Sequence, residues 1–250
     1  MKRHILIIAT TIMSMALTSC IISVDGDVKE GNGNIVTRNY DVTAFNEIYT
    51  ALPAVVNFTI SDNYTCSVST DENFFDYLEI KVKNGKLRLG IPKGQNTIVF
   101  RPTQFVIDIT APSLEEIYHA GSGNLNFLSP LNEKELEVKM AGSGNVVFKE
   151  EANIDHLELS VAGTSDIYLE KGSIRELEAL IAGSGKIVSH AEVQDMDANV
   201  AGSGDITAKV NGTLEYFIAG SGDIKYYGGA EVKGKIAGSG NVKQIEAPEH

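Results

Sequence analysis

A block of the form Ala-Gly-Ser-Gly-Asn/Asp-aliphatic, with small variations, recurs seven times in the second half of the chain. Successive copies are separated by 21, 21, 20, 19, 18 and 18 residues and begin at Ala120, Ala141, Ala162, Ala182, Ala201, Ala219 and Ala237. A unit of this length cannot bury its own apolar side chains, so such copies stack and share a continuous core. A helical interpretation fits poorly, because a Gly-Ser-Gly interruption would break a helix in every copy.

Apolar residues stand at fixed distances from each block. All seven copies carry one five residues after the block alanine, and the last six also carry them one and five residues before it, as in Leu136-Glu-Val-Lys-Met140. This alternation of apolar and polar residues is typical of a strand with one buried face. The sequence therefore predicts an all-β fold, a β-solenoid with coils of 18–21 residues that lie about 4.8 Å apart.

The blocks contain 13 of the 24 glycines, because six copies hold two and the copy at Ala162 holds one. These glycines have two structural interpretations. They mark a tight corner at which φ is positive, or the chain stays extended and Gly183 and Gly185 point inward, where the opposite wall comes close. The sequence leaves both interpretations open.

Residues 31–113 lack the block but keep the composition of strands. We expect them to form an N-terminal β-rich part that joins or caps the repeat solenoid of residues 114–246. Asn84-Gly85, between two alternating runs, predicts a β-hairpin turn, and Asp71 is expected to cap one helical turn. Gly31-Asn-Gly-Asn-Ile35 looks like a degenerate copy of the block.

The first nineteen residues have the features of a signal peptide. Lys2 and Arg3 precede a mostly apolar run of thirteen residues, about 20 Å as a helix and too short for a bilayer core of about 30 Å. Leu17-Thr-Ser-Cys20 resembles the bacterial lipobox, which predicts cleavage before Cys20, lipidation of its sulfur and a tether over residues 20–30. Cys66 is then the only cysteine of the mature chain, and we expect it to be a small buried apolar residue.

The stretches Asn34–Phe45 and Thr110–Ile117, followed by the run of Ala-Gly-Ser-Gly blocks, resemble the bacterial putative auto-transporter adhesin family with the head-GIN domain. Members of this family are often lipoproteins of Gram-negative bacteria. The resemblance covers roughly residues 31–245 and implies a right-handed, parallel β-helix-like fold in the cell envelope, as an outer-membrane lipoprotein on either face of that membrane. The family offers no agreed catalytic residues to carry over.

The formal net charge is −12, and removal of Lys2 and Arg3 with the signal peptide leaves 19 basic against 33 acidic side chains, or −14. Binding to the phosphate backbone of nucleic acids needs a positive surface, so we expect no nucleic-acid partner. The sequence contains no HExxH, CxxC or G-x-S-x-G motif. We therefore expect no catalytic residues, no metal centre and no cofactor.

The position after the second block glycine carries polar side chains with two interpretations. In successive copies it reads Asn124, Asn145, Asp166, Lys186, Asp205, Asp223 and Asn241. Turn propensity explains this pattern, whereas the sharper hypothesis is that Asp205 and Asp223 share a cation such as Ca²⁺. Tyr226 and Tyr227 are candidate ligand contacts, because exposed rings stack on sugars, although packing within the solenoid explains them too.

Together these features predict a non-catalytic, lipid-anchored envelope protein that presents a repetitive surface for adhesion or binding. Its expected partners are the membrane, through the lipid on Cys20, and a glycan, the extracellular matrix or another envelope protein. Two alternatives remain: a carbohydrate-active β-helix enzyme, with acids clustered on neighbouring coils, and a structural component of envelope assembly.

Overall fold

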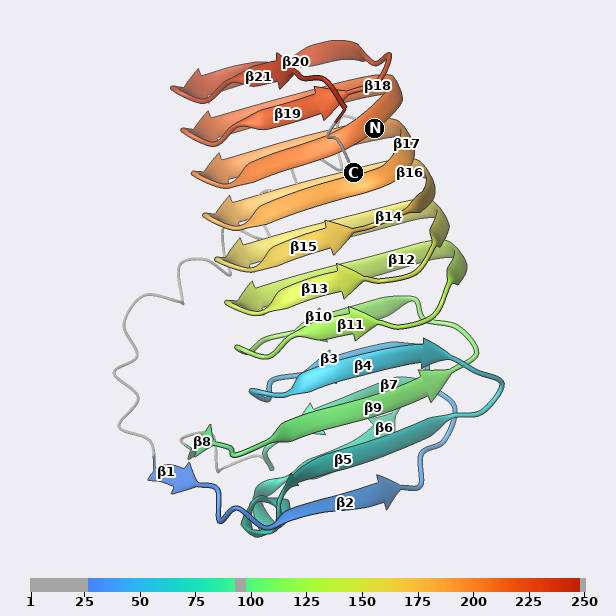
Figure 1. Cartoon of the computed structure of the whole chain (residues 1–250), viewed down its shortest axis with the longest axis vertical. Helices are drawn as coiled ribbons and strands as arrows, with labels where there is room; N and C mark the ends of the chain where they lie inside the picture. The colour runs from blue at the N-terminus through green and yellow to red at the C-terminus, as the bar shows by residue number, and fades with distance from the viewer. Residues whose placement is uncertain (1–26, 93–97, 248–250) are drawn as a thin grey trace.

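The computed structural model describes residues 27–92 and 98–247. From β10 onward the chain winds as a stack of coils, and each coil adds one strand to each of two facing sheets (Figure 1). Corresponding strands of successive coils pair in parallel and in register, as in Leu136–Leu157 and Leu157–Leu177. The predicted all-β solenoid with 18–21-residue coils is therefore confirmed.

One sheet, here the long-strand sheet, contains most of the residues that precede each block. In spatial order it consists of β6 (Glu79–Lys83), β7 (Lys86–Gly90), β3 (Glu47–Thr50), β10 (Glu116–His119), β12 (Leu131–Gly142), β14 (Ala152–Gly163), β16 (Gly172–Gly183), the later parts of β17 (Lys186–Gly202) and β18 (Asp205–Gly220), and β20 (Glu231–Gly238).

The facing sheet, here the short-strand sheet, contains the residues that follow each block. In spatial order it consists of β2 (Ile35–Tyr40), β5 (Thr65–Asp71), β9 (Phe105–Ala111), β4 (Val55–Ile60), β11 (Leu125–Phe127), β13 (Asn145–Phe148), β15 (Asp166–Leu169), the first parts of β17 and β18, β19 (Ile224–Tyr227), and β21 (Val242–Gln244). Only β2, β5 and β9 pair antiparallel in this sheet.

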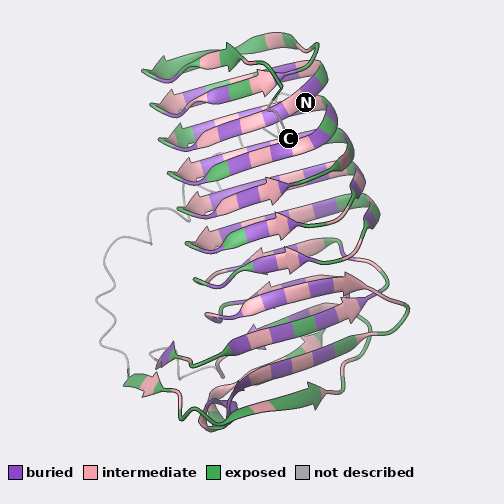
Figure 2. Cartoon of the chain, in the orientation of Figure 1, coloured by how far each residue is buried: buried purple, intermediate pink, exposed green. Residues whose placement is uncertain are grey.

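The core is built from ladders of equivalent side chains, one from each coil. The aliphatic residue five positions after the block alanine is at most 1% exposed in the first six copies, from Leu125 to Ile224. Buried and exposed residues alternate along the strands, as Figure 2 shows. This alternation follows from the period of two in a strand and places one apolar side chain above the next at each coil.

The first glycine of each block forms the corner between the two sheets. It ends the long strand, and its φ is positive in the last five copies, for example 143° at Gly183 and 130° at Gly202. This backbone region favours glycine because a Cβ atom would be strained there. The corner interpretation is therefore correct for the first glycine of the last five copies.

Close approach to the preceding coil constrains both glycines of a block: a Cβ atom on the first glycine, Gly142, would lie 2.0 Å from the carbonyl oxygen of Gly121. A Cβ atom built on Gly144 would lie 1.8 Å from the carbonyl oxygen of Gly123, one coil earlier. The close neighbour is thus the backbone of the preceding coil, and not the opposite wall that the extended interpretation assumed. Ser165 replaces the second glycine in the third copy, and its buried hydroxyl has no hydrogen-bond partner among the described residues.

The N-terminal end of the stack is closed by local structure that the repeats lack. A 3₁₀ helix, η1 (Glu72–Tyr77), buries Phe74 and Phe75, and the ring of Phe74 packs 4.7 Å from that of Phe100. The predicted turn at Asn84-Gly85 is present, with φ of 53° and 74°, between the antiparallel strands β6 and β7.

Asp71 precedes η1 as expected, but its side chain does not cap the helix. Its buried carboxylate instead accepts hydrogen bonds of 2.8 Å from the backbone N–H groups of Gly33 and Thr103. The Gly31–Ile35 segment leads into the antiparallel strand β2 and is not a coil of the parallel stack. The resemblance of this segment to the block was therefore misleading, because the carboxylate of Asp71 determines its conformation.

The two parts of the chain share one continuous sheet, since β10 pairs with β3 on one side and with β12 on the other. The division near residue 113 stays a prediction. Residues Asp27–Glu30, the last four of the predicted tether, form β1 and pair in parallel with β8 (Ile98–Arg101). Among the described residues, no helix has the length and apolarity needed to cross a bilayer.

Candidate functional site

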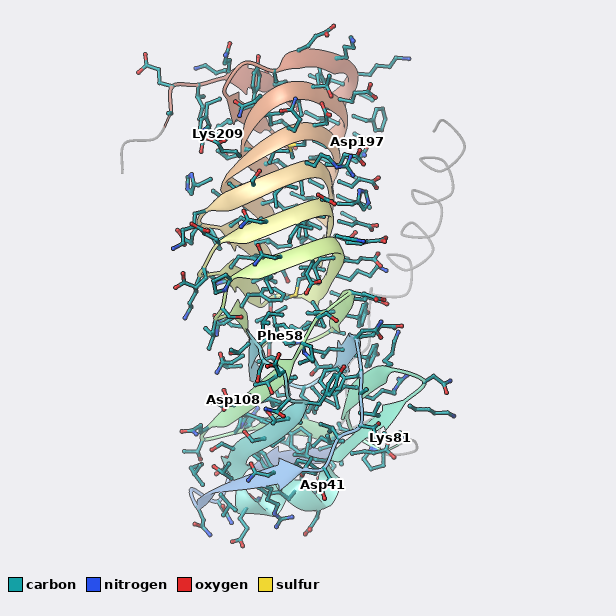
Figure 3. All side chains as sticks on the ribbon, turned by 90° about the vertical axis from the view of Figure 1, so that its right-hand side faces the viewer. Asp41, Phe58, Lys81, Asp108, Asp197 and Lys209 are labelled. Atoms are coloured by element: carbon teal, nitrogen blue, oxygen red, sulfur yellow. The ribbon has the colours of Figure 1, made fainter. Side chains whose placement is uncertain are left out.

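A row of seven carboxylates runs along the outer surface of the long-strand sheet. We call it the acidic ladder; parallel pairing in register places its members on successive strands: Glu47, Glu116, Glu137, Glu158, Glu178, Asp197 and Glu215. Neighbouring members are one strand apart, about 4.8 Å. Figure 3 shows Asp197 on this face and Asp108 on the opposite one.

Lysines lie at both ends of the acidic ladder. Lys86 pairs in register with Glu47 and forms ion pairs of 2.6 Å with Glu47 and 3.6 Å with Glu116. Lys233 follows Glu215 at the other end. Lys139, two residues after Glu137 on the same strand, contacts Glu116 and Glu137. The positive charges therefore gather at the ends and in the first half of the ladder.

The second half of the ladder is less well compensated. Within the described residues, no lysine or arginine forms an ion pair with Glu158, Glu178, Asp197 or Glu215. His156 lies 3.9 Å from Glu178 and carries charge only when it is protonated. Like charges on adjacent strands repel one another, so this stretch is electrostatically unfavourable.

Glu158 shows the effect of this crowding most clearly. Partial burial, together with the charge of Glu137, raises the pKa of Glu158 to about 7. Burial, helped by the charge of Glu178, also raises the pKa of Asp197. Both effects have the same cause, because desolvation and a neighbouring anion each disfavour the charged form of a carboxyl group. Within the ladder, Glu158 is therefore the carboxyl group that takes up a proton near neutral pH.

An aromatic pair lies beside the first members of the ladder. Tyr49 and Tyr118 stack with ring centroids 4.9 Å apart and ring planes at 7°. The guanidinium of Arg88 lies 4.7 Å from the centre of the Tyr49 ring. These contacts cover ring faces that a sugar would need for stacking.

The spacing of the ladder raises the question of glycosidase chemistry. Retaining glycosidases use two carboxyl groups about 5 Å apart, one with a raised pKa, and Glu137 and Glu158 approach this pattern. Substrate-binding sites are concave, however, and Glu137 and Glu158 line neither of two depressions on the surface, one beside β2 and β5 and one beside β16 and β17. The larger, of about 520 Å³, is lined by residues of β2 and β5, including Tyr40 and Cys66.

The Asn/Asp position forms a hydrogen-bonded ladder at the corner. The Oδ1 atom of Asp205 accepts a bond of 3.0 Å from the backbone N–H of Asp223, and Oδ1 of Asp223 accepts one of 2.9 Å from Asn241. Lys186 offers no acceptor, and the N–H of Asp205 instead bonds to the carbonyl of Gly185 at 3.2 Å. The described residues contain no group of three or more histidine, cysteine or acidic side chains that could hold a metal ion.

The two candidate tyrosines lie near the C-terminal end of the stack. Tyr227 is 7% exposed, and its hydroxyl lies 3.1 Å from Nδ1 of His190. Tyr226 is partly buried against the core.

The remaining reactive side chains are buried. Cys66 is 1% exposed, and burial raises the pKa of its thiol to about 12, which agrees with the expected apolar role. His119 is fully buried; burial lowers its pKa, and its Nε2 atom lies 2.8 Å from the carbonyl oxygen of Gly123. Cys20, the predicted lipidation site, lies outside the described residues.

The acidic ladder is the feature that the sequence reasoning missed. Six of its seven members stand four residues before a block alanine, from Glu116 before Ala120 to Glu215 before Ala219. The signal was therefore present as a fixed offset from the repeat. It was overlooked because a single acidic residue on a strand is usually only a solvated surface position.

Comparisons with known proteins agree with this architecture. The model of the family described as "Putative auto-transporter adhesin, head GIN domain" matches residues 44–230. The crystal structure of a putative lipid binding protein from Parabacteroides distasonis is 29% identical, covers 88% of this chain and 100% of its own, and has a TM-score of 0.76.

The crystal structure of a putative adhesin from Bacteroides fragilis is 24% identical, covers 87% of this chain and 100% of its own, and has a TM-score of 0.78. At this identity the likeness shows the fold alone. The curated proteins contain no match. Because the family model covers most of the chain, the protein belongs to the head GIN domain family of putative auto-transporter adhesins.

Proposed function

We propose that the protein is a non-catalytic, lipid-anchored component of the cell envelope, and that its rigid solenoid serves adhesion or binding. The observation that carries this proposal is the repetition of outward side chains in register along the stack. A partner whose own structure repeats with the same spacing makes the same contact at several coils. Many individually weak contacts to a rigid surface then add up to a high overall affinity. The family description supports the same role.

The test compares cells that carry the protein with cells from which it is deleted, on arrays of glycans and matrix proteins. Deletion is expected to reduce attachment to at least one surface. A Cys20→Ala variant, which lacks the predicted lipidation site, should release the protein from the envelope and reproduce the deletion. Unchanged attachment on every surface after deletion would overturn the proposal.

An enzymatic alternative is favoured only by the pair Glu137 and Glu158. These side chains lie on the outer surface of the long-strand sheet and line neither of the two depressions described above. Turnover of a panel of polysaccharides that is lost in a Glu158→Gln variant would establish this alternative and exclude the non-catalytic role.

A further inference from the structure

The two ends of the core are closed differently. At the N-terminal end, Phe74 and Phe75 of η1 cover it and are 0% and 6% exposed. At the C-terminal end, in the part of the chain that is described, β20 pairs only with β18, and β21 only with β19. Ile236 belongs to the same inward ladder as Ile218, but it is 41% exposed whereas Ile218 is 0% exposed. Figure 2 shows β20 as an exposed edge.

This open end lies far from the predicted anchor. Asp27, at the start of β1, stands seven positions after Cys20, a distance of at most about 25 Å along an extended chain. The strand β1 lies at the N-terminal end of the stack, and β20 at the opposite end (Figure 1). Nine steps of about 4.8 Å separate β6 from β20 in the long-strand sheet, which gives about 43 Å.

We propose that the open C-terminal end is a docking surface for the same end of a second copy of this chain, anchored in a facing membrane. The contact is an antiparallel pairing of the two β20 strands around a two-fold axis. It rests on the proposed function and deepens it, because it makes the adhesion homophilic.

The charges along β20 are self-complementary in this arrangement. Glu231, Lys233 and Lys235 alternate with the inward residues and therefore share the outer face. An antiparallel register centred on Lys233 sets Glu231 of each copy opposite Lys235 of the other and the two Lys233 side chains opposite each other, so two attractive pairs stand against one repulsive pair. Centring the pair on Gly234 instead would set Lys233 opposite Lys235, and like charges directly opposite are destabilising.

A lysine-rich edge commonly protects a sheet from unspecific pairing. Here the single Glu231 makes one register favourable while the lysines still repel others. The pairing also shields Ile236 and the unpaired backbone groups of β20 from water.

Contact between the C-terminal end of one copy and the N-terminal end of another is less favourable. The N-terminal end offers no open core, because η1 covers it, and it lies within the reach of the tether from the membrane. Two equal ends related by a two-fold axis form a closed pair and not a growing filament. Copies in facing membranes can therefore meet at their distal ends without further assembly.

The experiment uses the full lipidated chain in phosphatidylcholine vesicles, with clustering followed by light scattering. Native vesicles are expected to cluster. Glu231→Lys and Lys235→Glu each turn two attractive pairs into two repulsive ones, so each should slow clustering by about tenfold or more. Lys149→Glu, on an exposed position away from the edge, is the charge-matched control and should cluster as the native protein does.

Mixing the variants gives the decisive readout. Between one copy with Glu231→Lys and one with Lys235→Glu, both pairs between positions 231 and 235 are again of opposite charge, and the pair of Lys233 side chains is unchanged. Vesicles of the two variants, labelled with different dyes, should therefore cluster with each other while neither clusters alone. This rescue also shows that both variants are folded.

The proposal is overturned if native vesicles stay separate, if a single variant clusters like the native protein, or if the mixture stays separate. Native vesicles that stay separate while cells still attach to a glycan or matrix protein reject homophilic contact and leave the proposed adhesive function intact. Failure in both assays rejects both.

Discussion

The repeat solenoid and the N-terminal strands bury their apolar side chains equally well, but they hold the backbone by different means. In the solenoid one set of interactions is copied from coil to coil, with a glycine corner, an Asn/Asp hydrogen bond and an aliphatic ladder in nearly every copy. The N-terminal end relies on single contacts between distant residues, such as Asp71 with Gly33 and Thr103. The solenoid is therefore stabilised by many similar contacts, whereas the N-terminal end of the stack depends on a few individual contacts.

The largest effect is expected where the coils touch most closely. Gly144→Ala would place a Cβ atom 1.8 Å from the carbonyl oxygen of Gly123. The backbone of one coil must then shift, and we expect a loss of about 3 kcal/mol or more in the free energy of unfolding. Denaturant unfolding measures it.

Gly90→Ala is the matched control, because a Cβ atom at Gly90 meets nothing within 4 Å. It should change the free energy of unfolding by less than about 1 kcal/mol. Equal effects of the two variants would show that close stacking is not why the blocks contain glycine.

The next effect tests the cap. Asp71→Ala removes the acceptor of two backbone hydrogen bonds and leaves both N–H groups without it, at a cost of about 2–3 kcal/mol. Hydrogen exchange should speed up in β2 and β8 but not in β14 and β16. Asp76→Ala, on the exposed side of η1, is the control and should leave exchange unchanged.

A smaller effect is expected at the corner. Asp205→Ala removes one acceptor, that of the Asp223 N–H, and should cost about 1 kcal/mol. Lys186→Ala, at the same position of the preceding coil, removes no acceptor and should be nearly neutral. Thermal unfolding with and without calcium completes the test. If calcium raises the Tm of the native protein but not that of Asp205→Ala, the result would support the cation hypothesis instead.

The smallest effect concerns the acidic ladder and depends on pH. The pKa of Glu158 is about 7 in the folded chain against an ordinary value of 4.5, so the folded state binds more protons between these values. Stability is therefore fully present below about pH 4.5 and falls as pH rises toward 7. Glu137, Lys139, Ser160, His156 and Glu178 surround this carboxyl group.

Glu158→Gln should flatten this dependence and stabilise the protein at pH 8 by about 1 kcal/mol, a figure reduced for solvent screening. Melting temperatures across pH 4–8 measure it. Glu135→Gln, on an exposed position outside the ladder, should leave the slope unchanged. A Glu158→Gln variant with the same slope as the native protein would contradict the raised pKa of Glu158.

Much of the fold followed from local patterns in the sequence. The alternation around each block predicted the strands, and Asn84-Gly85 predicted its turn, because both depend on neighbours along the chain. Gly31–Ile35 was misread, because its conformation depends on Asp71, about forty residues away. The acidic ladder needed the exact register between coils before seven separate carboxylates became one row.

The sequence by itself determined the all-β architecture, the coil length and the buried positions, because a repeat with a period of two inside each unit has few ways to bury its apolar residues. Only the tertiary structure decided that the first glycine turns the corner and that both glycines face the backbone of the preceding coil, since both belong to the same tripeptide. It also decided that Ile236 is exposed while Ile218 is buried. The two occupy the same position in the repeat, and burial depends on whether another coil covers it.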